Sequence, residues 1–332
     1  MNIQFKTPII LAKSAIKISH KNQFLSIESC FSTNMGEKLN NASFKTCINP
    51  FGVLYNPISI ANVVNGVLNQ KQYDIKDLYA HQNFWVSFDH HGQFSNENPS
   101  HVLDAINNHI LEAKPFISNQ SVLLITWGSA HIYTHLTDGK IVANCHKIPA
   151  KEFSKEMLSV DSIVMEYSKL LFQLKELYPN LIVILTISPV RYLSDGFFQN
   201  QLSKSILHLA AHQLQEQNSN LQYFPAYEIM MDDLRDYRFY DTDMLHPSKL
   251  ALDYIWDQFS TQYFNSEAQQ LKSTIEELNQ ALQHRPFHSQ STAYKSFINQ
   301  QIEKIKGLQI QYTTLDLSLI LAKFEEKLKE IQ

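Results

Sequence analysis

The chain of 332 residues is 44% hydrophobic, which suffices for one large folded core with an extension. Its formal net charge of −4, without any long run of lysine or arginine, argues against nucleic acid as the main partner, because phosphate binding needs clustered positive charge. The three cysteines (Cys30, Cys47 and Cys145) lack a Cys-x-x-Cys spacing and are too few for a disulfide framework, so we expect a reduced, cytoplasmic protein.

The N-terminal segment is a poor match to a secretion signal. Its apolar core, "PIILA" at 8–12, is very short, no basic region precedes it, and Lys13 and Lys17 interrupt the residues after it. Elsewhere no stretch approaches the roughly 18 uninterrupted apolar residues of a membrane span. We therefore expect a soluble chain without a membrane span.

The first part of the chain alternates short strands with helices. The predicted elements are a strand at 24–28, a helix at 32–41, a strand at 43–48, a loop at 49–57 and a helix at 58–69. Ser32, Thr33 or Asn34 can cap the first helix. Two Asn-Pro pairs and a glycine give the loop its turn chemistry.

Two longer apolar runs predict strands that are buried on both faces. They are "SVLLITW" at 121–127 and "LIVILTI" at 181–187. A helical pattern at 160–178 precedes the second run, and a helical stretch at 198–217 leads to a weaker strand at 221–224. This alternation predicts an α/β fold in which helices flank a parallel sheet.

Two less regular segments, 72–118 and 130–150, are interpreted as insertions between these elements. The last helix of the sheet-forming part begins near Ser248, and its apolar residues fall on one face as far as Phe259.

Beyond about Phe264, glutamine, glutamate and lysine dominate, and apolar residues follow heptad spacing. We expect two or three amphipathic helices here, one broken by Pro286 and one ending near Gly307. The chain thus divides into a sheet-forming domain at 1–264 and a helical extension at 265–332. We interpret the extension as a helical hairpin packed on its own domain, because its helices are short for an autonomous coiled coil. The alternative is an interface for a homodimer or another partner.

In an open parallel sheet the reactive groups gather beyond the carboxyl ends of the strands. The residues that come after the predicted strands are Ser29 and Cys30, the loop 49–56, Gly128 and Ser129, and 188–191. Asp243 and His246 stand three residues apart, just ahead of the last helix. Such a loop can aim both side chains at one point, so that the carboxylate holds one imidazole nitrogen and the other takes a proton. The alternative is a surface or capping aspartate beside a packed histidine.

Six stretches of the chain occur in a characteristic order. They are "SIESCFSTNMGEKL", "NPFGVLYNPISI", "ANCHKIPAKEF", "TISPVRYLSDG", "YFPAYEIMMDDLRDYRFY" and "DMLHPS". Together they resemble the GSCFA-domain family, which belongs among the SGNH (GDSL-like) hydrolases, over roughly residues 20–260. The resemblance implies a flavodoxin-like three-layer α/β/α sandwich and acyl-ester hydrolase chemistry. It implies a nucleophile after the first strand, and Asp243 and His246 match the Asp-x-x-His pair of the last loop.

The first motif departs from the family pattern. Where the family has Gly-Ser-Cys-Phe-Ala, this chain begins with Glu28, and an acid there opposes an approaching anion and raises the pKa of a neighbouring thiol or imidazolium. The frame of the motif is also ambiguous, because alignment to Gly-Asp-Ser without a gap puts the serine position on Cys30, and a shift by one puts it on Ser29. Ser29 is preferred as the nucleophile, since serine is usual in the superfamily, and Cys30 remains the alternative.

The oxyanion site also differs from the wider superfamily, whose Gly-x-Asn-Asp block reads Gly-Ser-Ala-His here, at 128–131. The oxyanion-binding asparagine is therefore absent, and Asn56 or Asn144 is its candidate replacement. The backbone at Gly52 or Gly128 can also approach a ligand closely, although turn geometry alone explains a glycine at either place.

Arg191 is a candidate for binding a carboxylate or phosphate on the substrate, or for pairing with an internal acid. Two histidine pairs have i,i+4 spacing, at 131 and 135 and at 208 and 212, but no complete set of three or four ligands is visible. We therefore predict neither a metal nor another cofactor.

The sequence thus predicts an acyl-ester hydrolase or acyltransferase that acts through Ser29 or Cys30, His246 and Asp243. Its substrate is expected to be a small-molecule or glycan-linked ester. The alternative is a catalytically inactive SGNH-like protein that binds a ligand or partner. Glu28 and the missing asparagine favour this alternative, whereas the intact Asp-x-x-His pair opposes it.

Overall fold

The computed structural model describes residues 7–11, 14–27, 30–284, 286–288 and 290–331. The chain forms two compact units. The first comprises the N-terminal stretch through Leu11, Phe24–Gly36 and Thr46–Asp257, and the second comprises Ala12–Gln23, Glu37–Lys45 and Gln258–Gln332.

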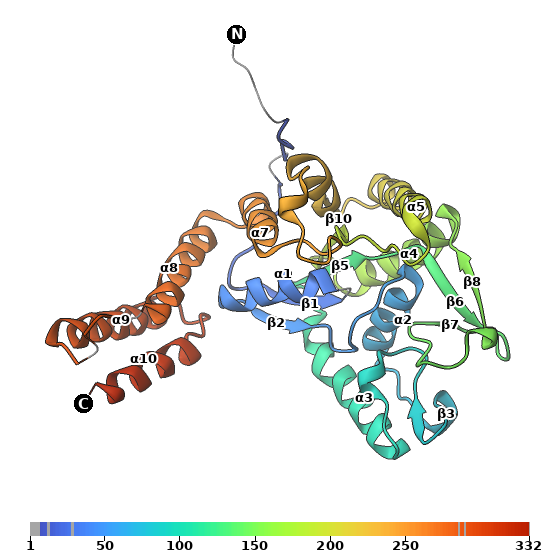
Figure 1. Ribbon diagram of the computed structural model, residues 1–332, viewed down its shortest axis with the longest axis horizontal. Coiled ribbons are helices and arrows are strands. Elements are labelled where there is room, and N and C mark those ends of the chain that lie inside the picture. The colour runs from blue at the N-terminus through green and yellow to red at the C-terminus, as the bar shows by residue number, and fades with distance from the viewer. Residues whose placement is uncertain (1–6, 12–13, 28–29, 285, 289, 332) are drawn as a thin grey trace, which may run out of the picture. The chain divides into compact units, whose positions relative to one another are not determined.

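The first unit is built on a five-stranded parallel sheet with the order β10-β9-β5-β1-β2 (Figure 1). Its strands are β1 (Gln23–Ile27), β2 (Lys45–Ile48), β5 (Ser121–Trp127), β9 (Ile182–Ile187) and β10 (Leu221–Phe224). Counted along the chain this order is 2-1-3-4-5, which is the flavodoxin-like arrangement. The predicted α/β class and sandwich are therefore confirmed.

Both faces of the sheet are buried at the central strands β5 and β9, which explains the continuous apolar runs in the sequence. All seven residues of β5 are buried. Leu123, Ile125 and Trp127 point into one core cluster, whereas the equally buried Val122 and Leu124 alternate with them and do not belong to that cluster.

Helices cover the faces of the sheet (Figure 1). Helices α2 (Pro57–Leu68), α4 (Val160–Leu177) and α5 (Gly196–Gln217) pack side by side, α4 against both of the others. Helices α1 (Cys30–Asn41) and α7 (Lys249–Tyr263) carry buried stripes of their own. The short α6 (Ala226–Glu228) continues into a π-helical turn, Ile229–Asp233.

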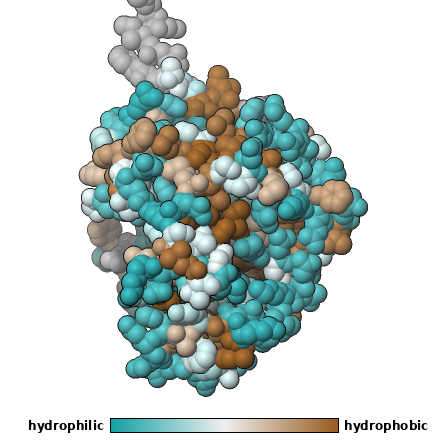
Figure 2. Space-filling model, turned by 90° about the vertical axis from the view of Figure 1, so that its right-hand side faces the viewer, coloured by the Kyte–Doolittle hydropathy of each residue, from teal (hydrophilic) through white to brown (hydrophobic). Residues whose placement is uncertain are grey.

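The two irregular segments, together with the residues just after the second one, contain strands that the sequence patterns did not predict. A hairpin joins β3 (Tyr79–His81) to β4 (Phe84–Val86), and α3 (Pro99–Ala113) comes after it. A second sheet has the order β7-β6-β8, formed by β6 (His131–His135), β7 (Ile141–Val142) and β8 (Phe153–Met157). On the face shown in Figure 2, apolar residues stand in small groups among hydrophilic ones.

The second unit contains α8 (Ser266–Gln283), α9 (Thr292–Gln311) and α10 (Ser318–Glu330), which share one apolar core. Their predicted amphipathic faces are confirmed, since Leu271, Ile298 and Phe324 are all buried in that core. The predicted helix end near Gly307 was wrong: α9 continues to Gln311. A Cβ at position 307 would meet nothing within 4 Å, so this glycine lies on an open side of the helix and does not stop it.

No helix in the described part of the chain is long and apolar enough to cross a membrane. The boundary between 264 and 265 stays a prediction.

Candidate active site

The Asp243–His246 loop holds the aspartate and the histidine in direct contact. The Asp243 Oδ2 atom lies 2.5 Å from His246 Nδ1. The Asp243 Oδ1 atom accepts the backbone N–H groups of Leu245, at 2.8 Å, and of His246, at 2.9 Å. Both side chains are a little under half exposed, at 44% for Asp243 and 43% for His246. The contact between Asp243 and Nδ1 therefore orients the imidazole, and the exposed part of the ring is accessible to a substrate.

The surroundings of Asp243 keep its carboxylate charged. The backbone N–H groups of His246 and Leu245, followed by the His246 ring, lower the pKa of Asp243 to about 2. At any ordinary pH the carboxylate can accept a hydrogen bond from Nδ1–H, which fixes the tautomer that leaves Nε2 as the proton acceptor. Within the described residues, Nε2 makes no hydrogen bond.

The backbone closes this loop on itself ahead of α7. Asp241 donates its N–H to the His246 carbonyl at 2.8 Å, and Met244 donates to the Asp241 carbonyl at 2.9 Å. Met244 takes a φ of 59°, a left-handed conformation that tightens the turn. Tyr240 and Pro247 form an isolated antiparallel bridge, so the two ends of the loop are joined.

Arg191, located after β9, supports the same loop from a segment more than fifty residues away. Its backbone N–H donates to the Leu245 carbonyl at 3.2 Å, and its Nη1 donates to the Met244 carbonyl at 3.3 Å. Its guanidinium lies 5.0 Å from the ring centroid of Phe197 and 5.4 Å from that of Tyr240. No carboxylate pairs with Arg191 among the residues described.

Gly128, at the end of β5, packs against two tyrosines. The backbone N–H groups of Gly128 and Ser129 both donate to the Tyr55 carbonyl, at 2.9 and 3.0 Å. A Cβ at position 128 would lie 2.9 Å from Tyr192 Oη and 3.1 Å from the Tyr55 oxygen. Only glycine fits this approach without displacement, and its N–H is already engaged.

The other candidate oxyanion residues have local structural tasks. Asn56 is buried and caps α2, since its Oδ1 accepts the Ser59 N–H at 2.8 Å and its Nδ2 donates to Ser59 Oγ at 3.0 Å. Asn144 Oδ1 accepts the His146 N–H at 2.7 Å. Gly52 has a φ of +76°, and a Cβ there would lie 2.3 Å from the Cβ of His91.

Lys204 is a buried charged residue at the carboxyl edge of the sheet that the sequence reasoning missed. Its side chain is only 1% exposed, and Nζ donates to the Gly128 carbonyl at 2.8 Å and to the Ser188 carbonyl at 2.7 Å. It therefore ties together the carboxyl ends of β5 and β9, and burial lowers its pKa to about 7. The signal in the sequence was a lysine within the inward stripe of a helix, with Leu207 and Ala211 at helical spacing.

The nucleophile candidates follow β1 in the chain. Glu28 and Ser29 lie outside the described residues, and Cys30 is the first residue of α1. The other two cysteines are unsuited to attack, because burial raises the pKa of Cys47 to about 11 and also raises that of Cys145.

The histidine pairs with i,i+4 spacing do not gather ligands. Nδ1 of His135 lies 2.9 Å from Asp138, and Nε2 of His208 lies 3.4 Å from Glu228. Among the described residues no group of three or more His, Cys, Asp and Glu side chains is arranged for a metal ion.

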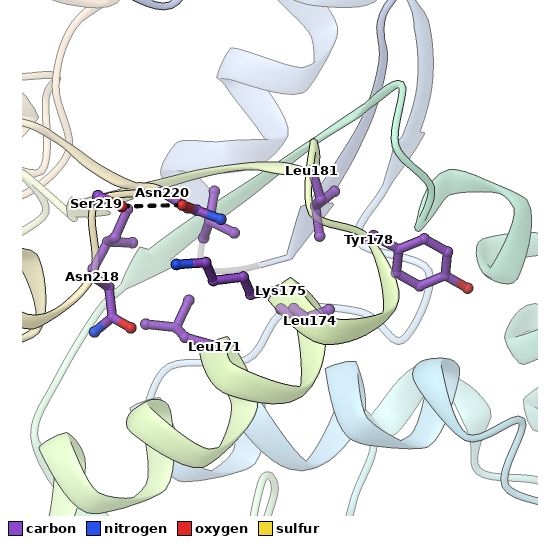
Figure 3. A pocket seen from close by; sticks show the side chains of 10 residues that line it. Leu171, Leu174, Lys175, Tyr178, Leu181, Asn218, Ser219 and Asn220 are labelled. Atoms are coloured by element: carbon purple, nitrogen blue, oxygen red, sulfur yellow. Dashed lines mark hydrogen bonds between the residues drawn. The ribbon is translucent and has the colours of Figure 1, made fainter.

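A small hollow at the opposite end of the sheet is not part of this site. It has a volume of about 20 Å³ and lies at the start of β9 and β10, between residues of α4 such as Leu174 and Lys175 and the turn at Ser219–Asn220 (Figure 3). This space holds little more than one water molecule. A much larger cavity, of about 520 Å³, has Arg191 in its wall.

Comparisons with known proteins identify sequence families and two structural likenesses. The model of the GSCFA family matches residues 23–259, and that of the GSCFA domain protein, C-terminal domain, matches residues 275–330. No curated protein matches the chain. A carbohydrate esterase family 3 structure from Talaromyces cellulolyticus is 9% identical with a TM-score of 0.33, and an acetyl esterase mutant with an acetate ion is 10% identical with a TM-score of 0.34. Each covers 79% of this chain and 99% of its own.

Proposed function

Because the chain belongs to the GSCFA family, we propose that it is an acyl-ester hydrolase or acyltransferase of the SGNH (GDSL-like) type, acting through Ser29 or Cys30, His246 and Asp243. The observation that carries this proposal is the Asp243–His246 geometry. A carboxylate fixed by two backbone N–H groups contacts Nδ1 and leaves Nε2 directed away from it.

In the proposed reaction His246 Nε2 takes the proton of Ser29 as the oxygen attacks the ester carbonyl carbon. Asp243 stabilises the imidazolium that forms, and the imidazolium then gives its proton to the departing alcohol oxygen. The acyl group is left on Ser29, and water or a second alcohol, activated by the same imidazole, releases it. Cys30 would follow the same steps from its thiol.

The substrate of this proposal is a small-molecule or glycan-linked ester. Of the residues predicted to bind it, Arg191 is proposed to contact the substrate, whereas Gly52, Asn56, Gly128 and Asn144 are proposed to shape the site by fixing the backbone of their loops. We also propose a cytoplasmic location, because the cysteines are few and have no Cys-x-x-Cys spacing.

One observation favours the alternative of an inactive, ligand-binding protein. The N–H groups of Gly128 and Ser129, at the edge where an oxyanion hole is expected, both donate to the Tyr55 carbonyl. An oxyanion donor must be available where charge develops, so these two groups serve only if Tyr55 releases them.

The test is turnover of short-chain p-nitrophenyl esters by the wild type and by Ser29→Ala, Cys30→Ala and His246→Ala. A serine esterase loses roughly 10³-fold or more in kcat/KM in Ser29→Ala and His246→Ala and keeps its activity in Cys30→Ala. Loss in Cys30→Ala instead identifies a thiol enzyme.

A second measurement is needed in case the protein accepts only a narrow range of esters. A fluorophosphonate probe should label the wild type and fail to label His246→Ala. If no ester is turned over and no His246-dependent adduct forms, the binding role replaces the hydrolase.

A further inference from the structure

The cavity beside Arg191 extends beyond the groups that take part in the proposed acyl transfer. Its volume of about 520 Å³ is within the range of small-molecule sites. Its wall comes from the segment after β9, the start of α5, the π-helical turn and the residues that lead to the Asp243–His246 loop. Its lining includes Arg191, Phe197, Met230, Met231, Tyr237 and Tyr240.

This cavity adjoins the Asp243–His246 loop at two places. Arg191, in its wall, donates to the Met244 carbonyl. Tyr240, also in its wall, forms the bridge with Pro247, the residue directly after His246. A molecule in the cavity therefore lies next to the loop that positions the imidazole.

Arg191 is the charged residue of the cavity wall that forms no ion pair within the part of the chain that the structure describes. Arg235 Nη2 lies 2.6 Å from Asp232, and Asp236 lies 3.3 Å from Arg238, so the two other charged residues of the wall are neutralised locally. Arg191 has no such pair within the described residues, and its contacts are with a carbonyl, with aromatic rings and with the hydroxyl of Tyr240.

The arrangement around Arg191 suits an anion at the edge of its guanidinium. The Phe197, Tyr240 and Tyr237 ring centroids lie 5.0, 5.4 and 5.9 Å from its central carbon. A guanidinium has five N–H groups in one plane, and the Met244 carbonyl takes one of them. The remaining edge can bind two oxygens of a carboxylate or phosphate, while the rings and methionines contact an apolar portion.

We propose that this cavity binds an anionic group, a carboxylate or a phosphate, carried by an apolar portion of the substrate. That the bound molecule is a substrate rests on the proposed ester hydrolysis, whereas the binding of an anion rests on the cavity alone. Arg191 is then a specificity-determining residue.

The first test is binding, which needs no turnover. Probes are monomethyl glutarate, its neutral analogue dimethyl glutarate, and phenyl phosphate. They are titrated into the full chain carrying ¹³C-labelled methionine methyl groups. The signals of Met230 and Met231, in the wall, should shift with the anionic probes, and that of Met165, which is exposed on α4, should not. Monomethyl glutarate and phenyl phosphate distinguish a carboxylate site from a phosphate site.

Variants then assign the binding to Arg191. Arg191→Gln should raise the dissociation constant of the anionic probe roughly ten-fold or more, because a charge-assisted hydrogen bond is lost, and leave the binding of the neutral probe unaffected. Arg191→Lys should recover part of the difference. Lys169→Gln is the control, since it removes the same charge at an exposed position of α4 that does not line the cavity. If the wild type binds the anionic and neutral probes equally, or if Lys169→Gln weakens binding of the anionic probe as much as Arg191→Gln does, the inference is wrong.

A kinetic comparison separates this inference from the proposed function. The kcat/KM of p-nitrophenyl hydrogen glutarate should exceed that of p-nitrophenyl butyrate, and Arg191→Gln should abolish the preference. Turnover of both esters without preference overturns the cavity assignment and keeps the hydrolase. Anion binding at Met230 and Met231, without turnover of any ester and without a His246-dependent fluorophosphonate adduct, overturns the hydrolase and keeps the anion site.

Discussion

Replacing Lys204 by methionine is expected to change how the stability of the protein depends on pH. Burial lowers the pKa of Lys204 from its ordinary 10.5 to about 7 in the folded chain, and unfolding returns it to the ordinary value. Between these two pH values the unfolded chain binds a proton that the folded chain lacks. The wild type therefore gains stability as the pH rises through this window and loses it as the pH falls towards 7.

The magnitude is set by the width of the window. At ~1.36 kcal/mol per pH unit, the interval between 10.5 and about 7 amounts to about 5 kcal/mol. This is an upper bound, because the carbonyl oxygens of Gly128 and Ser188 favour the charged amine. In Lys204→Met this pH-dependent contribution is absent, and both carbonyls lose their donor, at about 1–3 kcal/mol each.

The assay is urea unfolding followed by tryptophan fluorescence at about pH 6.5, 8 and 9.5. The free energy of unfolding of the wild type minus that of Lys204→Met should increase with pH above about 7, by up to ~1.4 kcal/mol per pH unit. Lys169→Met, the same change at an exposed position of α4, is the control and should give a difference that does not vary with pH. If the free energy of unfolding of the wild type minus that of Lys204→Met stays constant or decreases as the pH rises, the reasoning is refuted.

Three further substitutions test the loop and the two tight glycines. Asp243→Asn should lower the kcat/KM of ester hydrolysis by about 10²–10⁴-fold at unchanged thermal midpoint, because the amide no longer fixes the imidazole tautomer; an equal kcat/KM would contradict the assigned role. Gly52→Ala should lower the free energy of unfolding by about 2–4 kcal/mol, since the new Cβ overlaps a histidine, whereas Gly139→Ala, also at positive φ but in open space, should lose only about 1 kcal/mol. Gly128→Ala should lose about 1–3 kcal/mol, and a second change of Tyr192→Phe should recover part of it; no recovery would mean that the Tyr192 hydroxyl is not the obstacle.

The sheet was predictable because its strands are buried on both faces. A run such as 121–127 has to be apolar throughout when helices cover both sides, and this pattern is visible in a single sequence. The strands at 131–135 and 153–157 were not predicted, since they are short, mixed in polarity and fixed by pairing with each other. Gly307 was read as a helix end, but propensity yields to packing when the glycine lies on the open side of a helix.

The residues of the candidate site also differ in how far the sequence could predict their contacts. Asp243 and His246 are three residues apart, so the local spacing carries their contact, and the structure places them in hydrogen-bonding distance. Lys204 and Arg191 act over long separations in the chain, through the carbonyls of Gly128 and Met244, and a backbone carbonyl leaves no mark in the sequence. Their partners become visible only when the sheet brings the loops together.

These long-range contacts also bear on where an oxyanion would be held. Tyr55 takes the N–H groups of Gly128 and Ser129, and Lys204 takes the Gly128 carbonyl, so the backbone at the end of β5 is engaged on both sides. Asn56 is committed to the start of α2. Oxyanion donors need to be available before the charge develops, because their benefit comes from being in place in advance. The N–H groups of Gly128 and Ser129 can therefore serve as oxyanion donors in the proposed reaction only if the Tyr55 carbonyl releases them.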